Sequence, residues 1–318
     1  MPRHFDDLML GTLELFCRAA ELQSFSQAAG VLNISPAAVS KTIHRLEQKL
    51  GCALFVRTTR HVRLTEAGEH YLSYCKTALS AMYDAENALQ DLKTIPAGKI
   101  RVCLPNDYAY LKVFPLIPKF RRRYPQIEID FSLRFRIPRQ ENPGCDIVLT
   151  SWLNYLPDWV ATKIDYSVFW VVASPEYLKK APPLDTIDDL RNHNCLQMHL
   201  PENVHPLRWP FVLDNNEIIH IETQGDMAFF EDIMATYYMA LNGNGPAIMH
   251  DFIVRKAVDN GQLIRLLKPW TRVSHIHYIA CPADSMKSPR IRAFTTFLAE
   301  ELKPAGGFPQ DAIIIPVR

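Results

Sequence analysis

Residues 24–51, SFSQAAGVLNISPAAVSKTIHRLEQKLG, constrain the fold more than any other part of this chain. Four apolar residues recur there at the spacing that places them on one side of an α-helix, namely Val39, Ile43, Leu46 and Leu50. Ser35 is a good N-cap, and Pro36 suits the first helical turn, where no N–H is needed. The preceding segment has an apolar side made of Ala28, Ala29 and Leu32. The pattern therefore predicts two short amphipathic helices around a tight turn.

The second of these helices has a polar and basic side opposite its apolar stripe. The candidate contacts there are Ser35, Pro36, Ala37, Ser40, Lys41, His44 and Arg45. A helix-turn-helix places such a helix in the major groove of DNA, where these side chains would reach phosphates and base edges. For the two helices alone, the alternative is an ordinary helix pair with a solvated polar face.

The residues that follow favour DNA binding over that alternative. Residues 54–57 and 62–64 are predicted to form the two strands of a β-hairpin, a wing beside the helix, with Arg57 and Arg63 on its strands and Arg60 at its tip. From residue 35 to residue 64, six basic residues stand against one acidic residue, a net charge of +5 in a chain whose total is +1. A local basic patch on a near-neutral protein is typical of nucleic-acid binding.

Three motifs in this order resemble the LysR-type transcriptional regulators. They are SPAAVS-K-x-I-x-R-L-E-x-x-L-G from Ser35, LF-x-R from Leu54 and LTEAG from Leu64, and the resemblance extends to about residue 302. Many members of the family have Gln where this chain has Pro36, so the base contact often made by that Gln is not carried over. A branch of the family has Ser-Pro at this point.

The resemblance implies the fold, the partners and the domain boundaries. The fold is expected to be an N-terminal winged helix-turn-helix, a long linker helix that makes a dimer, and a C-terminal α/β effector-binding domain whose two subdomains resemble periplasmic binding proteins. The expected partners are double-stranded DNA with an interrupted palindromic operator, a small-molecule effector of unknown identity, further copies of the chain in a homodimer and homotetramer, and RNA polymerase if the protein is an activator. The boundaries are residues 1–65 for DNA binding, 66–94 for the linker helix, 95–302 for the regulatory domain (subdomain I 98–166 and 273–302, subdomain II 167–272) and 303–318 for a tail outside the resemblance.

Apolar periodicity predicts a long helix after the wing and then alternating strands and helices. The long helix, residues 66–93, has two apolar stripes, one for its own domain and one for a partner chain. The other elements that matter below are a first helix at residues 5–23, a helix from Asn106 to residue 123 that Pro115 and Pro118 bend or shorten, separate strands at residues 159–164 and 168–173, a helix at residues 227–241, and an edge strand or packed segment at residues 313–317.

Ligands of open α/β sheets bind outside the carboxyl ends of the strands, and polar residues follow several predicted strands here. The family binds small inducers between the subdomains, and many of these are carboxylates held partly by a hydroxyl residue at the first such turn. This chain has Asn106 and Asp107 there instead. The candidate effector contacts are Asn106, Asp107, Arg134, Arg136, Thr150, Ser151, Trp152, Met198, His199 and Pro246.

The charges of these candidates point in opposite directions. Asp107 would repel an anion and favour a neutral or cationic effector, unless it is simply an acid stabilised at a helix N-terminus. Arg134 and Arg136 alternate on one face of a strand end, where they could clamp a carboxylate or form a solvated edge. The sign of the effector's charge therefore stays open.

Other function classes have little support in the sequence. There is no P-loop, GxGxxG, GxSxG or HExxH motif, so we expect no enzyme, no catalytic residue and no cofactor. The seven cysteines are scattered and form no CxxC, which favours buried free thiols over disulfides or zinc. His275 and His277 share one face of a probable strand and are expected to be hydrogen-bonded there, not metal ligands.

A solute-binding transport protein is the remaining alternative, because the C-terminal two-thirds resembles that fold. The winged helix-turn-helix counts against it. So does the N-terminus, which has two adjacent acids and no small-residue cleavage site. No apolar run approaches the ~20 residues that span a bilayer. We therefore expect a cytoplasmic protein without membrane contact.

Overall fold

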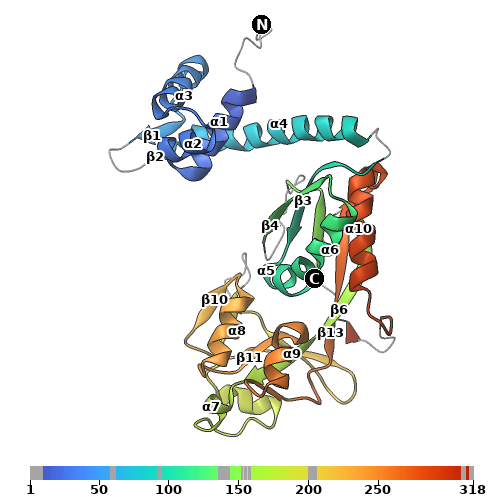
Figure 1. Ribbon diagram of the computed structural model, residues 1–318. Coiled ribbons are helices and arrows are strands. Elements are labelled where there is room, and N and C mark those ends of the chain that lie inside the picture. The colour runs from blue at the N-terminus through green and yellow to red at the C-terminus, as the bar shows by residue number, and fades with distance from the viewer. Residues whose placement is uncertain are drawn as a thin grey trace. The chain divides into compact units, whose positions relative to one another are not determined.

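The computed structural model describes residues 10–57, 62–91, 95–134, 144–151, 153, 156, 159–199, 206–308 and 313–314. The chain divides into two units, residues 1–90 and residues 91–318. The first is mainly helical, and the second is built around one mixed β-sheet (Figure 1).

The first unit has the predicted winged helix-turn-helix. Its elements are α1 (Leu10–Leu22), α2 (Phe25–Val31), α3 (Pro36–Leu50), β1 (Phe55–Arg57), β2 (Val62–Leu64) and α4 (Glu66–Asp91). Strands β1 and β2 pair antiparallel with Phe55 opposite Leu64, which confirms the wing. Residues 5–9 of the predicted first helix lie outside the described residues.

Local signals set both ends of α3. The Ser35 hydroxyl accepts a hydrogen bond from the N–H of Ala38 at 3.2 Å, with Pro36 in the first turn as predicted. Gly51 ends the helix in the left-handed region, with φ of 72°, and its N–H donates to the carbonyl of Glu47 at 2.9 Å. The stripe of α3 faces a core that includes Phe16, Ala19, Ala28, Val39, Ile43, Leu46 and Leu54.

The start of α4 approaches the chain before the wing very closely. A Cβ added to Gly68 would lie 2.1 Å from the carbonyl oxygen of Leu54, closer than any side chain tolerates. The same carbonyl accepts a hydrogen bond from the N–H of Thr65 at 3.0 Å, while the Thr65 hydroxyl accepts one from the N–H of Gly68 at 2.9 Å. The glycine of the LTEAG motif therefore lets α4 lie against the segment that enters the wing.

A mixed sheet runs through the whole second unit. Its strand order is β11-β6-β13-β5-β3-β4, with β12 also on β6 and β14 also on β13. The strands are β3 (Gly98–Leu104), β4 (Ile127–Leu133), β5 (Ile147–Thr150), β6 (Trp159–Ala173), β11 (Ala247–His250), β12 (Ile264–Leu266), β13 (Val273–Pro282) and β14 (Ile313–Ile314). The prediction of separate strands at 159–164 and 168–173 is wrong. Strand β6 is continuous because β13 pairs with its first part and β11 and β12 pair with its end.

Separate apolar cores divide this unit into two lobes that β6 and β13 join. The first lobe packs around Ile100, Val102, Leu104, Phe120, Phe294 and Phe297. The second lobe packs around Val172, Met249 and Val254 on one face of its sheet, and around Val171, Trp209 and Phe211 on the other. In Figure 1 the two long strands run side by side from the green lobe into the yellow and orange lobe.

Helices cover the sheet of the first lobe. They are α5 (Asn106–Tyr108), the π-helical turn η1 (Ala109–Val113), the 3-10 turn η2 (Phe114–Leu116), α6 (Ile117–Arg123), the 3-10 turn η4 (Ala283–Lys287) and α10 (Pro289–Leu302). The predicted helix from Asn106 to residue 123 is interrupted as expected, because Pro115 and Pro118 have no N–H to donate.

The second lobe contains two departures from the prediction. Its further elements are α7 (Pro175–Leu178), η3 (Ile187–Asn192), β7 (Gln197–His199), β8 (Trp209–Val212), β9 (Ile218–Ile221), β10 (Ala228–Phe230), α8 (Ile233–Leu241) and α9 (Asp251–Asp259). The predicted helix at residues 227–241 is wrong at its start, where β10 pairs in parallel with β7. Glu231 then has a φ of 60°, and Asp232 caps α8 by accepting from the N–H of Met234 at 3.0 Å. Helix α9 has no counterpart among the predicted elements.

The C-terminal segment returns to β13. Ile313 and Ile314 pair in parallel with Val273 and Ser274, which confirms the predicted edge strand for these two residues. Residues 315–317 of that prediction lie outside the described residues.

Candidate DNA-binding surface and effector site

Helix α3 separates its apolar and basic residues onto opposite sides. Val39, Ile43 and Leu46 are buried in the core of the first unit. Lys41, His44 and Arg45 are exposed. A buried stripe fixes how the helix is rotated, so these three polar side chains are held outward together.

The other predicted DNA contacts lie around this face. Ser35, Pro36 and Ala37 are exposed at the start of α3, Ser40 is half-buried, and Arg63 is exposed on β2. The backbone of Arg57 belongs to β1, but its side chain and all of Arg60 lie outside the described residues.

Glu47 is the one acidic residue between residues 35 and 64, and its carboxylate is hydrogen-bonded to the backbone. Its Oε1 accepts hydrogen bonds from the backbone N–H of Leu54 at 2.9 Å and of Phe55 at 3.1 Å. The residue therefore holds the wing to the recognition helix. Sequence reasoning missed this role; the available signal is that Glu47 directly follows the stripe residue Leu46.

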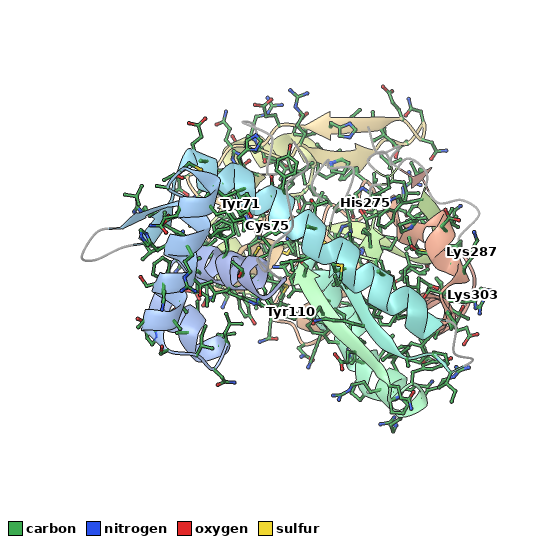
Figure 2. The ribbon with its side chains drawn as sticks, turned by 90° about the horizontal axis from the view of Figure 1, so that it is seen from above. Tyr71, Cys75, Tyr110, His275, Lys287 and Lys303 are labelled. Carbon is green, nitrogen blue, oxygen red and sulfur yellow. The ribbon has the colours of Figure 1, made fainter. Side chains whose placement is uncertain are left out.

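Helix α4 has one packed side and one exposed side. Tyr71, Leu72, Cys75 and Leu79 pack on the core of the first unit, and Figure 2 shows Tyr71 beside Cys75. The hydrogen bond to Cys75, together with burial, raises the pKa of the Cys17 thiol. Tyr74 and Met82, in contrast, are 66% and 42% exposed. The side of α4 that faces away from this core therefore includes two large exposed apolar side chains.

The first strand end of the second unit brings the two lobes together. Strand β3 ends at Leu104, and α5 begins at Asn106. The Asn106 side-chain amide donates a hydrogen bond to Asp232 Oδ1 at 3.2 Å, across to the cap of α8 in the second lobe. The N–H of Arg134 donates to the carbonyl of Leu104 at 2.9 Å, which holds Arg134 at the neighbouring strand end.

Asp107 is buried beside this bridge and is only 5% exposed. Burial raises the pKa of its carboxyl to about 6, although hydrogen bonds from the backbone N–H groups of Tyr108 and Asp107 itself act in the opposite direction. The charge of Asp232 adds to the increase. Within the described residues, Asp107 Oδ1 has no hydrogen-bond partner. The backbone N–H groups at the start of α5 therefore do stabilise the ionised carboxyl of Asp107, but its removal from solvent has the larger effect on the pKa.

The remaining effector candidates are dispersed. Thr150 is buried and Ser151 half-buried at the end of β5. Met198 belongs to the core of the second lobe, and the carbonyl of Pro246 accepts from the N–H of Leu196 at 2.9 Å. His199 stacks on Phe230 with ring centroids 4.7 Å apart, and among the described residues its Nδ1 has no partner. Arg136 and Trp152 lie outside the described residues.

Three histidines lie where β6 and β13 join the lobes: His275 and His277 are buried, and His250 is half-buried. Ser167 Oγ is 2.9 Å from His250 Nδ1 and 2.7 Å from His277 Nε2. Because one hydroxyl has one proton, it donates to one ring and accepts from the other. His277 is thus hydrogen-bonded as predicted. His275 (Figure 2) is buried too, but within the described chain its Nδ1 has no partner.

Burial keeps these histidines neutral. It lowers the pKa of His275 to about 4 and that of His277 to about 3, and it lowers the pKa of His250 well below the usual value. For His277 the neighbouring charges of His275 and Lys112 act in the same direction.

Tyr108 connects this group to the effector candidates. Its ring stacks on His277 at 4.7 Å, and its hydroxyl donates to Asp165 Oδ2 at 3.3 Å. Lys112 Nζ lies 2.9 Å from the same carboxylate oxygen. The residue after Asp107 is therefore fixed to both joining strands.

The described residues contain no group of three or more His, Cys, Asp or Glu side chains that could hold a metal ion. In the part of the chain that the structure describes, no helix is both long and apolar enough to cross a membrane.

Two family models match most of the chain. Residues 10–69 match the bacterial regulatory helix-turn-helix protein, lysR family, and residues 94–303 match the LysR substrate binding domain. The transcriptional regulator CrgA of Neisseria meningitidis serogroup C (strain 8013) is 32% identical over 291 residues, 91% of this chain and 96% of CrgA. PtxR of Pseudomonas aeruginosa is 27% identical over 296 residues, 93% of each chain.

Solved structures of such proteins have a similar fold. The structure of CrgA from Neisseria meningitidis has a TM-score of 0.59 at 29% identity, covering 92% of this chain and 99% of that one. Full-length AphB, the Vibrio cholerae virulence activator, has a TM-score of 0.67 at 22% identity, with coverage of 92% and 99%. The AphB likeness concerns the fold alone.

Proposed function

Because this chain belongs to the LysR family of transcription regulators, it is a DNA-binding regulator with an effector-binding domain, and we propose how each part acts. The exposed face of α3 reads an interrupted, roughly twofold-symmetric operator, and an effector bound at the Asn106–Asp107 turn controls the outcome. The functional parts are residues 1–65 for DNA binding, 66–94 for assembly and 95–302 for regulation, in subdomains 98–166 with 273–302, and 167–272.

The observation that carries the DNA proposal is the outward basic face of α3, opposite its buried stripe. Lys41 contacts a phosphate, together with Arg57. Ser40 and His44 contact base edges, near the end of the helix that enters the major groove. Arg60 reaches the adjacent minor groove and gives an A·T preference at the flanks of each half-site.

Titration of the protein's own upstream DNA against random DNA tests these roles. Lys41→Ala should weaken both complexes and reduce the salt slope of binding by about one, because one phosphate contact is lost. His44→Ala should instead lower the preference for the operator over random DNA. Lys180→Ala, a charge-matched control on the exposed part of the second lobe, should change neither. An unchanged salt slope for Lys41→Ala would contradict the assigned face.

We also propose that the exposed side of α4 forms a homodimer, and that dimers associate into a tetramer. The support is the exposure of Tyr74 and Met82 on a helix already packed on its other side. Half-sites read by such a dimer lie about one helical turn, ~34 Å, apart. Sedimentation that detects only monomer at micromolar concentration would contradict the dimer.

If the regulator is an activator, RNA polymerase is a further partner. The site of action is the cytoplasm, where the DNA is.

For the effector, we propose a neutral or cationic group that donates hydrogen bonds to Asp107. The support is the buried Asp107 oxygen without a partner in the described chain, and the second carboxylate, Asp232, near it. Arg134 could hold a carboxylate elsewhere on the same compound.

A thermal-shift screen with primary amines, matched carboxylates and amino acids tests the proposed effector chemistry, since a ligand that binds the folded state raises its apparent stability. Stabilisation by amine-bearing compounds should disappear in Asp107→Asn. Stabilisation by simple carboxylates alone would contradict the role of Asp107. The relatives named above are transcriptional regulators, which supports a regulatory and not an enzymatic role.

A further inference from the structure

The segment that follows α10 contacts both strands that join the lobes. The regulatory family model ends at residue 303, yet the chain beyond it makes defined contacts. Residues 304–308 follow α10, and the Phe308 ring lies 6.5 Å from the ring of Tyr166 on β6. Ile313 and Ile314 then pair with the start of β13.

These contacts fall on the two strands that join the lobes. Tyr166 is paired with Ile276 of β13, within the stretch that leads from one lobe to the other. The register of β6 and β13 shifts between His277 and Tyr278, beside this position. A shift of register weakens and bends a strand pair, so the joining strands are least regular where the tail passes.

The described residues of this segment connect the first lobe to the second. Helix α10 supplies Phe294 and Phe297 to the core of the first lobe. Ile313 packs against the core of the second lobe, which contains Val273 and Trp209. In Figure 1 the red loop that directly follows α10 lies beside the long strands β6 and β13.

The β13 edge explains why the segment fits there. Strand β5 pairs with β13 only from Tyr278 to Ala280. At Val273 and Ser274, the edge of β13 that faces away from β6 is therefore not paired with β5. Strand β14 pairs with this edge instead. An uncovered edge has backbone N–H and C=O groups available for pairing, so even a short strand can anchor there.

We propose that residues 304–308 together with Ile313 and Ile314 act as a strap, which ties the last helix of the first lobe to the second lobe and restrains the angle between them. A two-residue strand is a small anchor, so the strap is released at far lower cost than either lobe unfolds. It therefore sets how freely the lobes move. The proposal depends on the two-lobe fold alone and not on the effector site.

Pulsed electron–electron distance measurements on the full chain test the strap without DNA or effector. Spin labels at Glu128→Cys in the first lobe and Asp214→Cys in the second, both exposed positions, report the distance between the lobes. Cys52→Ser removes the exposed native thiol. Excess unlabelled chain, mixed in before assembly, leaves one labelled copy in each oligomer.

A chain that ends at Lys303 should give a distance distribution about twice as broad as the full chain, because the lobes change angle more freely. Ile313→Asp in the full chain should broaden it as well, which keeps the test decisive if the truncated chain folds poorly. A chain that ends at Ile314 keeps every described contact and should match the full chain. If the Lys303 chain and Ile313→Asp both keep the original width, or if the Ile314 chain broadens equally, the strap does not exist.

Discussion

Glu47 and Leu54 are joined by a hydrogen bond of 2.9 Å from the Leu54 N–H to the Glu47 carboxylate, which fixes the wing to the recognition helix. The carbonyl of the same Leu54 accepts the N–H of Thr65 at the start of α4. One peptide segment thus positions α3, the wing and α4 relative to each other. A DNA-binding surface needs this, because the helix and the wing must reach the duplex in a fixed geometry.

Removal of the Glu47 carboxylate should loosen that arrangement. In Glu47→Ala, two backbone N–H groups lose their acceptor, at a cost of about 1–3 kcal/mol in the unfolding free energy of the first unit. Glu47→Gln keeps an acceptor oxygen and should lose less. Urea denaturation followed by circular dichroism measures both. Equal losses of unfolding free energy in the two variants would show that the negative charge of Glu47, and not its hydrogen bonds, stabilises the first unit.

The close approach of α4 to Leu54 makes a second prediction. Gly68→Ala places a Cβ against the Leu54 carbonyl and should destabilise the first unit by about 1–3 kcal/mol, although alanine favours helices. Gly30→Ala is the matched control, because nothing lies within 4 Å of the added Cβ on α2. That control should be neutral or stabilise by up to ~1 kcal/mol. In the same denaturation assay, the unfolding free energy should therefore fall in Gly68→Ala and stay the same or rise in Gly30→Ala.

The buried carboxylate of Asp107 should lower the unfolding free energy of the second unit at neutral pH. Its pKa is about 6 in the folded chain against 3.8 as the ordinary value, so the folded state favours the protonated acid. Its stabilising contribution is present below pH 3.8 and is lost as the pH rises through 6. Asp107→Asn should therefore stabilise the unit by about 1–3 kcal/mol at pH 7.5, with the gain shrinking toward pH 4.

Thermal melts of wild type, Asp107→Asn and the exposed control Asp214→Asn at both pH values measure this difference. A loss of stability of similar size at both pH values would mean that the Asp107 carboxylate makes a favourable contact.

The buried histidines should have the opposite pH dependence. The folded pKa of His275 is about 4 and the ordinary value is 6.5, so the folded state favours the neutral ring. That contribution is complete above pH 6.5 and is lost as the pH falls toward 4, with a slope of up to about 1.4 kcal/mol per pH unit. His275→Gln should make the decline in the urea midpoint between pH 7 and pH 5 less steep. The exposed His220→Gln should leave the decline as it is in wild type.

Prediction from sequence works best where the deciding interactions are local. The stripe of α3, its Ser35 cap and the wing all depend on residues within one or two turns of each other, and each is confirmed. The start of the helix predicted at residues 227–241 failed because β10 pairs with β7, some 30 residues away in sequence. Asp107 shows the same limit, since its environment depends on Asp232 and on burial, which no local pattern encodes.

The order in which the strands of the second unit pair has a consequence for how this protein is made. Strands β3, β4 and β5 leave the ribosome early, but β13 and α10, which complete the first lobe, come after most of the second lobe. At ordinary rates of translation the nascent first lobe waits on the order of ten seconds with an apolar sheet face uncovered. The first unit needs only earlier residues and can fold during that time. Synthesis should therefore produce a folded winged helix attached to an aggregation-prone half-lobe, and the yield of intact protein should depend on chaperones that bind nascent chains.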